Sequence, residues 1–189
     1  MDSVLIISSA EKSSAQLGEM LVQSSIARVA SAKSAGEARR ILATSEFDLY
    51  IVNAPLADEP ADILARDLIE RLSGEVMMLV KEEKFLETTD RLSEFGVITV
   101  AKPLNRSAFW SAVKMAEASH NRFKMMRREN EKLRQNIEDI KVINRAKLLL
   151  VSRLSMSEPE AHKYIEKQAM DQRQTRRAIA DNILKTHEG

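Results

Sequence analysis

The chain has 189 residues, of which 44% are hydrophobic and 30% are charged, a composition typical of a globular protein with one large or two small domains. It contains no cysteine, which excludes disulfides, thiolate metal sites and cysteine nucleophiles. The net charge of +1 conceals an asymmetry, because residues 1–105 carry 11 Lys and Arg against 17 Asp and Glu, whereas residues 106–189 carry 18 against 11. A basic second half predicts an anionic partner, with nucleic acid as the leading candidate.

No apolar run approaches the 18 residues that a membrane span needs, so no membrane partner is expected. The first ten residues are strand-like and lack the basic segment that opens a signal peptide. Together with the missing cysteine, these features predict a cytoplasmic protein.

The first hundred residues alternate between strand-like and helix-like patterns. Apolar runs predict strands at residues 4–7, 27–30, 48–52, 76–80 and 97–100. Between the strands we expect four helices. The first covers residues 13–24, and the second follows a Ser34 cap whose capping box is completed by Glu37. The third runs through Ile63, Leu64, Leu68 and Leu72, and the fourth covers residues 84–95. This alternation predicts an α/β fold of flavodoxin-like (βα)5 type, a parallel sheet covered by helices on both faces.

The carboxyl ends of these strands are where such folds place their chemistry. The strand that ends at Asn53 with a proline two residues later, and the Ala101-Lys102-Pro103 sequence after the fifth strand, resemble the CheY-like receiver domain of response regulators. A working receiver has acidic Mg²⁺ ligands after its first strand and a phosphoacceptor aspartate after its third. Here Ser8 and Ser9 replace the acidic pair and Asn53 replaces the aspartate. We therefore expect residues 1–118 to form a pseudo-receiver without phosphorylation, metal, cofactor or enzymatic activity.

Two details at these strand ends stay open. Asn53 either hydrogen-bonds Lys102, as a fixed imitation of the phosphorylation site, or caps the turn after its strand. Asp58, Glu59 and Asp62 follow in the next loop and are interpreted as a solvated acidic rim rather than a metal site.

Residues 105–147 contain neither proline nor glycine, which predicts a helix far longer than the 8–20 residues usual in globular proteins. Asn105 is its expected cap, and Phe109, Trp110 and Val113 are expected to pack on the sheet. Apolar residues and one Asn then recur at alternating spacings of three and four, which predicts a coiled-coil linker at residues 119–140 and a parallel homodimer. The alternative is a single long helix packed on its own domain. The expected dimerisation residues are Phe123, Met126, Asn130, Leu133, Ile137 and Ile140.

Residues 141–189 predict a small all-α bundle of three helices. The long helix should end near residues 154–155, Ser157-Glu158-Pro159-Glu160 starts the next one, and Asp171 or Gln172 ends it. A third helix is expected through Thr175, Ile179, Ile183 and Leu184.

This region resembles the ANTAR domain, the RNA-binding module of transcription antitermination regulators. The resemblance rests on Arg145-Ala146-Lys147, Met156-Ser157-Glu158, Ala161, Ala169-Met170 and Ile179-Ala180 with Ile183. Leu148 and Glu166 depart from the family pattern, where Gly and Arg are common. The resemblance implies binding to hairpins in a nascent leader transcript.

Recognition of RNA uses cations for phosphates and aromatic rings for unstacked bases. Tyr164, the only aromatic residue of the bundle, is either such a ring or part of the core. Two alternatives to an RNA-binding antiterminator are a protein–protein adaptor and a DNA-binding response regulator, and a regulatory protein partner is left open. The candidate RNA-binding residues are Arg145, Lys147, Lys163, Tyr164, Arg173, Arg176 and Arg177.

Overall fold

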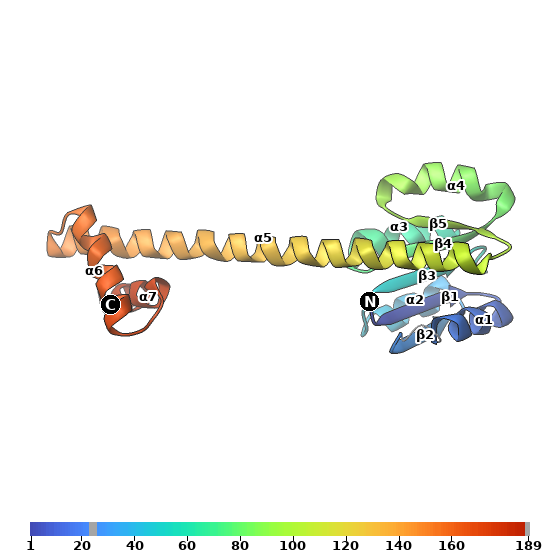
Figure 1. Ribbon diagram of the computed structural model, residues 1–189, viewed down its shortest axis with the longest axis horizontal. Coiled ribbons are helices and arrows are strands. Elements are labelled where there is room, and N and C mark those ends of the chain that lie inside the picture. Colours follow the sequence, from blue (N-terminus) through green and yellow to red (C-terminus); the bar gives the residue numbers. More distant parts are fainter. Residues whose placement is uncertain (23–25, 188–189) are drawn as a thin grey trace. The chain divides into compact units, whose positions relative to one another are not determined.

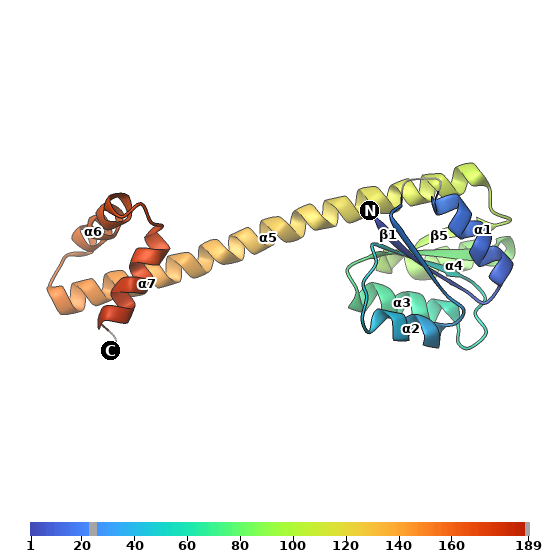
Figure 2. The same cartoon turned by 90° about the horizontal axis from the view of Figure 1, so that it is seen from below.

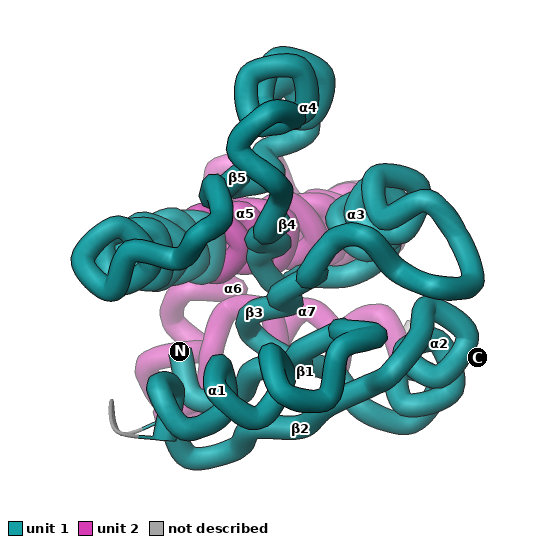
Figure 3. Tube along the Cα trace, turned by 90° about the vertical axis from the view of Figure 1, so that its right-hand side faces the viewer, with its two compact units in different colours: residues 1–124 teal, residues 125–189 magenta. Residues whose placement is uncertain are grey.

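The computed structural model describes residues 1–22 and 26–187. Ser24, the expected end of the first helix, lies outside these ranges. The chain divides into two compact units, residues 1–124 and 125–189 (Figure 3). None of the described helices is long and apolar enough to cross a membrane.

The first unit is built on a sheet of five parallel strands in the order β2-β1-β3-β4-β5 (Figure 1). The central strands β1, β3 and β4 are almost entirely buried because helices cover both faces of the sheet, as expected for parallel sheets. Ser8 at the end of β1 pairs in register with Asn53 at the end of β3, which brings the two side chains to the same edge. The strands are β1 (Ser3–Ser8), β2 (Arg28–Ala32), β3 (Leu49–Asn53), β4 (Glu75–Lys81) and β5 (Ile98–Lys102).

The helices of this unit form two layers (Figures 1 and 2). Helix α1 and the beginning of α5 share one apolar core with one face of the sheet, and α2, α3 and α4 share a second core with the other face. The predicted receiver-type architecture is confirmed. The helical elements are α1 (Glu11–Val22), α2 (Ala35–Leu42), α3 (Ala61–Arg71), η1 (Glu82–Lys84), α4 (Phe85–Leu92), η2 (Ser93–Phe95) and α5 (Arg106–Leu154).

Two local expectations for these helices need correction. The helix expected through Ile63, Leu64, Leu68 and Leu72 is α3, but it ends at Arg71, so Leu72 is the residue after its end. The helix begins directly after Pro60, and its buried face carries residues 61, 64, 65 and 68. Ile63 lies outside this face and is 54% exposed. At α2, the Ser34 hydroxyl accepts the backbone N–H of Glu37 as predicted, but the Glu37 carboxylate accepts from the backbone of Lys33 rather than from Ser34.

Helix α5 begins as the sequence predicts. The Asn105 side-chain oxygen accepts the backbone N–H of Ser107 at 2.8 Å, so Asn105 caps the helix. Phe109 and Val113 are buried against the sheet, and Trp110 packs edge-to-face on Phe109. From residue 121 to residue 138, every side chain of α5 is exposed.

The second unit contains the end of α5 with α6 (Glu158–Asp171) and α7 (Arg176–His187). The predicted helix ends at residues 154 and 171 are confirmed. At the start of α6, the backbone N–H and hydroxyl of Ser157 both donate to the Glu160 carboxylate, which lowers the pKa of Glu160. The core of this unit is small and rich in alanine, with Ala146, Leu150, Ala161, Ile165, Ala169, Ile179, Ala180, Ile183 and Leu184 buried.

Candidate functional site

Three of the four residues expected at the receiver site meet at the carboxyl end of the sheet. The side-chain amide of Asn53 donates to the Ser8 hydroxyl at 2.9 Å, and the Lys102 ammonium donates to the amide oxygen of Asn53 at 2.9 Å. Lys102 also donates to the backbone carbonyl of Ala54. The hydrogen bond between Asn53 and Lys102 is therefore confirmed. The Asn53 amide donates a hydrogen bond to a hydroxyl and at the same time accepts one from an ammonium group.

The fourth residue, Ser9, points elsewhere. Its hydroxyl accepts the backbone N–H of Ala57 at 2.9 Å and so holds the loop after β3. Within residues 1–22 and 26–187, no three His, Asp or Glu side chains are grouped as metal ligands. The arrangement at Asn53 can bind and orient Lys102, but a neutral amide offers no carboxylate to attack a phosphoryl group.

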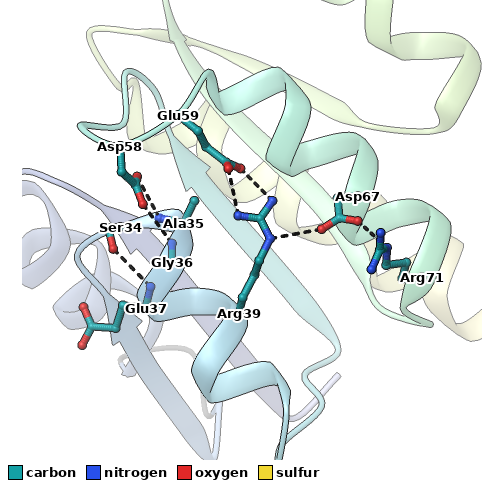
Figure 4. Close-up of polar contacts among 9 residues, drawn as sticks. All are labelled: Ser34, Ala35, Gly36, Glu37, Arg39, Asp58, Glu59, Asp67 and Arg71. Carbon is teal, nitrogen blue, oxygen red and sulfur yellow. Dashed lines mark hydrogen bonds and ion pairs between the residues drawn. The ribbon is translucent and has the colours of Figure 1, made fainter.

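The acidic residues of the loop after β3 hold neighbouring helices (Figure 4). The Asp58 carboxylate accepts the backbone N–H groups of Ala35 and Gly36 at the start of α2, at 3.0 and 2.9 Å. Glu59 binds both terminal nitrogens of Arg39, at 2.8 and 2.9 Å. Asp58 is exposed, in agreement with the predicted solvated rim. The partners of Asp58 and Glu59 were not predicted, because the sequence does not reveal backbone donors or cations that come from distant elements.

Asp58 should make the stability of the first unit pH-dependent. The N–H groups of Gly36 and then Ala35 hold the pKa of Asp58 below its ordinary value. A carboxylate with a lowered folded-state pKa stabilises the fold above its unfolded pKa, and that contribution is lost as the pH falls through the folded value. We expect Asp58→Asn to lower the urea midpoint at pH 7, and the difference from wild type to narrow as the pH falls below about 4.

The measurement is urea unfolding followed by the fluorescence of Trp110, the only tryptophan. Glu83→Gln is the matched control, because Glu83 is an exposed carboxylate of the same unit. The assigned role of Asp58 would be contradicted if the difference in urea midpoint between Asp58→Asn and wild type did not change with pH. It would also be contradicted if Glu83→Gln lowered the urea midpoint by the same amount.

The expected dimerisation residues all lie on the exposed part of α5. Their apolar members keep about half or more of their surface in contact with solvent within the single chain. Asn130 is exposed as well. A row of large apolar side chains at heptad spacing is what a second helix would cover. The exposed fractions are 50% for Phe123, 59% for Met126, 55% for Leu133, 53% for Ile137 and 58% for Ile140.

Three candidate RNA-binding cations have acidic partners within the second unit. The Lys147 ammonium lies 2.8 Å from the Glu158 carboxylate, which joins the end of α5 to the start of α6. Arg176 lies 3.2 Å from Glu166. These contacts give both cations a structural role, and they show that Glu166, a departure from the family pattern, binds a neighbouring arginine.

Arg177 is held in a similar way by two carboxylates. It lies 2.8 Å from Asp139 of α5 and 3.0 Å from Asp181 of α7, and both contacts raise its pKa. Lys163 and Arg173 differ, because both are exposed and have no ion pair in the part of the chain that the structure describes. Arg145 is exposed on α5. The pairing of Asp139 with Arg177 spans 38 positions and could not be predicted from local spacing.

Tyr164 is not part of the core, because 38% of its side chain is exposed. It lines a shallow pocket of about 180 Å³ between α6 and α7. The polar residues of this pocket were not predicted, because amides on exposed helix faces carry no sequence motif of their own. The other lining residues are Gln168, Gln172, Ile179, Asn182, Ile183 and Thr186.

Arg173 occupies an unusual backbone position at the end of α6. Its φ of 52° lies in the left-handed region, where glycine is favoured. The N–H of Arg173 donates to the carbonyl of Met170, and the N–H of Gln174 donates to that of Ala169. This pattern is a Schellman motif with arginine in the place usually taken by glycine. The chain thus presents an exposed cation at the tip of the α6–α7 turn at some conformational cost.

We expect Arg173→Gly to stabilise the second unit by about 1 kcal/mol, because glycine adopts the left-handed conformation without steric strain. Amide hydrogen exchange of α6 and α7 in the full-length chain measures this directly. The control is Gln172→Gly, whose φ of −92° gives glycine no such advantage and which should destabilise the same helices. Faster exchange in Arg173→Gly than in wild type would refute the prediction.

Comparison with known proteins identifies the second unit. Residues 131–184 match the model of the ANTAR domain family. The C-terminal part of the chain is an ANTAR domain. The match begins inside the segment predicted as a linker, so the ANTAR domain includes part of the exposed region of α5. The domain boundaries expected from sequence stay predictions.

Relatives and structures agree with this organisation of receiver fold and ANTAR domain. The chain is 25% identical to the transcriptional regulatory protein PdtaR of Mycobacterium tuberculosis over 171 residues, which cover 90% of this chain and 83% of that protein. A CheY-like receiver domain protein from Methanospirillum hungatei matches with a TM-score of 0.58 and 18% identity, over 65% of this chain and 98% of its own. The HemR receiver domain from Leptospira biflexa matches with a TM-score of 0.54 and 23% identity, over 61% and 94%.

Proposed function

We propose that this protein is a dimeric RNA-binding antitermination regulator whose ANTAR domain binds hairpins in a nascent leader transcript. The ANTAR match to residues 131–184 carries the proposal. It is supported by the excess of Lys and Arg over Asp and Glu after residue 105. We place the protein in the cytoplasm, where such transcripts are made, and assign it no enzymatic activity.

Different residues of the ANTAR domain contact different parts of the RNA. Arg145, Lys163 and Arg173 contact phosphates, because they are exposed and end in strong hydrogen-bond donors. Tyr164 stacks on an unpaired loop base, since half-exposed aromatic rings offer a face to any base. Lys147, Arg176 and Arg177 contribute mainly through the ion pairs that hold the three helices together.

The target RNA is identified by crosslinking the protein to cellular RNA and sequencing the recovered fragments. Filter binding to a recovered RNA with tandem hairpins, compared with a scrambled RNA of equal length across a salt series, tests the proposal. Binding to the hairpins at salt concentrations that release the scrambled RNA is expected. Equal affinity for both would leave only nonspecific charge attraction and would favour the adaptor function instead.

The receiver is proposed to act without phosphorylation, because Asn53 and Ser8 replace the groups that transfer requires and Asn53 already engages Lys102. We expect no stable label after incubation with a small phosphodonor and Mg²⁺, measured by intact-protein mass spectrometry. Asn53→Asp should remain unlabelled as well, since it supplies a nucleophile but no metal ligands at residues 8 and 9. A receiver with a complete acidic site serves as the positive control, and labelling of the wild type would refute this part of the proposal.

Dimerisation is proposed to occur through α5. The exposed row from Phe123 to Ile140 is too regular for isolated surface residues, and a second copy of the same helix is its natural complement. Asn130 occupies a core position of the heptad, where it would fix the register of two parallel helices. A regulatory protein partner could act by competing for this helix.

A further inference from the structure

A second cavity lies in the first unit, at the carboxyl ends of β3 and β4 and against α3 and α4. Its volume is about 360 Å³, within the range of small-molecule sites. The apolar residues that line it are Pro55, Pro60, Ala61, Met78 and Val80. The polar residues that line it are Asp62, Lys81, Lys84, Thr88 and Arg91.

The polar lining residues carry an excess of positive charge. Asp62, the only carboxylate among the described lining residues, is already paired with Arg91 at 3.0 Å. Lys81 and Lys84 have no ion pair within residues 1–22 and 26–187. Lys102 lies nearby, and burial, together with the like charge of Lys81, lowers its pKa. An anion beside these ammonium groups would relieve their repulsion.

Thr88 gives the cavity a hydrogen-bonding group. It lies on α4 and lines the cavity, and the residue as a whole is only 4% exposed. Its hydroxyl oxygen is not one of the fully buried, unpartnered polar atoms of the described residues, so a ligand in the cavity could form a hydrogen bond with it. The neighbouring Thr89 donates to the carbonyl of Phe85.

We propose that this cavity is a binding site for a small organic anion, a carboxylate or phosphate carried on an apolar body. The anionic group lies beside Lys81 and Lys84, the body packs on Met78 and Val80, and a polar atom of the ligand bonds Thr88. Such a ligand would occupy the same end of the sheet as Asn53 and Lys102, and would supply the receiver with a signal that needs no phosphoryl transfer. This inference is independent of RNA binding.

The test uses the full-length chain with ¹³C-methyl methionine, in which Met78 is assigned through Met78→Leu. The probes are phenyl phosphate and benzoate. They are compared with inorganic phosphate, which is an anion without an apolar body, and with benzyl alcohol, which is an apolar body without an anionic group. We expect a saturable shift of the Met78 signal with one or both aromatic anions and binding at least about tenfold weaker with the other two probes. The tighter of the two aromatic anions identifies the anionic group that the site prefers.

Variants separate this site from general surface charge. Lys84→Gln should weaken binding of the preferred probe by about tenfold, because it removes a charge-assisted hydrogen bond. Thr88→Val should weaken it severalfold while keeping the shape of the side chain. Lys12→Gln, which removes an exposed lysine on α1, should change nothing.

Three results would overturn the proposal. One is the absence of a saturable Met78 shift with both aromatic anions. Another is inorganic phosphate binding as tightly as phenyl phosphate, which would reveal surface charge alone. The third is equal affinity in Lys84→Gln and Lys12→Gln, with both variants shown to be folded by their Trp110 fluorescence.

Discussion

Replacing Ile137 and Ile140 by Asn should convert the protein from a dimer to a monomer. Each Ile is more than half exposed in the single chain, so pairing of two helices would bury four such side chains. Burial of an Ile side chain contributes about 1.5–3 kcal/mol, so the double variant should weaken dimerisation by at least about a thousandfold. Sedimentation velocity across a range of protein concentrations measures the change.

The control for this variant is Lys132→Asn with Gln135→Asn on the same helix. Both residues are exposed and lie outside the apolar row, and the replacements bring a similar loss of helix propensity. This control should remain dimeric. A wild-type protein that is monomeric at micromolar concentration, or a control that dissociates as readily as the Ile variant, would refute pairing through α5.

Neutralising Arg145, Lys163 and Arg173 together, each as Gln, should weaken RNA binding by about 100-fold at low salt. Each exposed cation that contacts a phosphate contributes about 1 kcal/mol and releases a counterion from the RNA. The slope of the logarithm of affinity against the logarithm of salt concentration should therefore fall by about 2. Filter binding to the RNA recovered by crosslinking, across a salt series, gives both quantities.

The matched control is Lys12→Gln with Arg40→Gln and Lys114→Gln, which removes three exposed basic residues from the first unit. It changes the net charge by the same amount and should leave the salt slope unchanged if contact occurs only through the ANTAR domain. A similar loss of affinity in both triple variants would show that total charge, and not these three positions, determines binding.

The sequence predicted the elements of the chain well where the pattern is local. The strand that ends at Asn53, the Asn105 cap and the ends of α5 and α6 depend on neighbouring residues, and each was confirmed. The pairing of Asn53 with Lys102 could be expected only because the receiver pattern places both at the same edge of the sheet. The end of α3 was less certain, because the helix stops at Arg71 and not at the expected Leu72.

Contacts between distant elements could not be predicted. Asp58 finds its partners at the start of α2, 22 and 23 positions earlier, and Asp139 binds an arginine 38 positions later. The hydropathy pattern reports only that such residues are polar. For the same reason the sequence could not separate candidate cations held by carboxylates from those, such as Lys163, that have no ion pair among the described residues.

The buried alanines at the centre of the ANTAR domain restrict which of its residues can be exchanged. Ala146, Ala161 and Ala180 have no exposed surface, so any larger side chain there would act as a wedge between helices. Lys163, Arg173 and Tyr164 are exposed outside this tightly packed centre, so they can change without disturbing the packing of the helices. Related proteins could therefore acquire new transcript preferences by exchanging surface residues around an unaltered alanine framework.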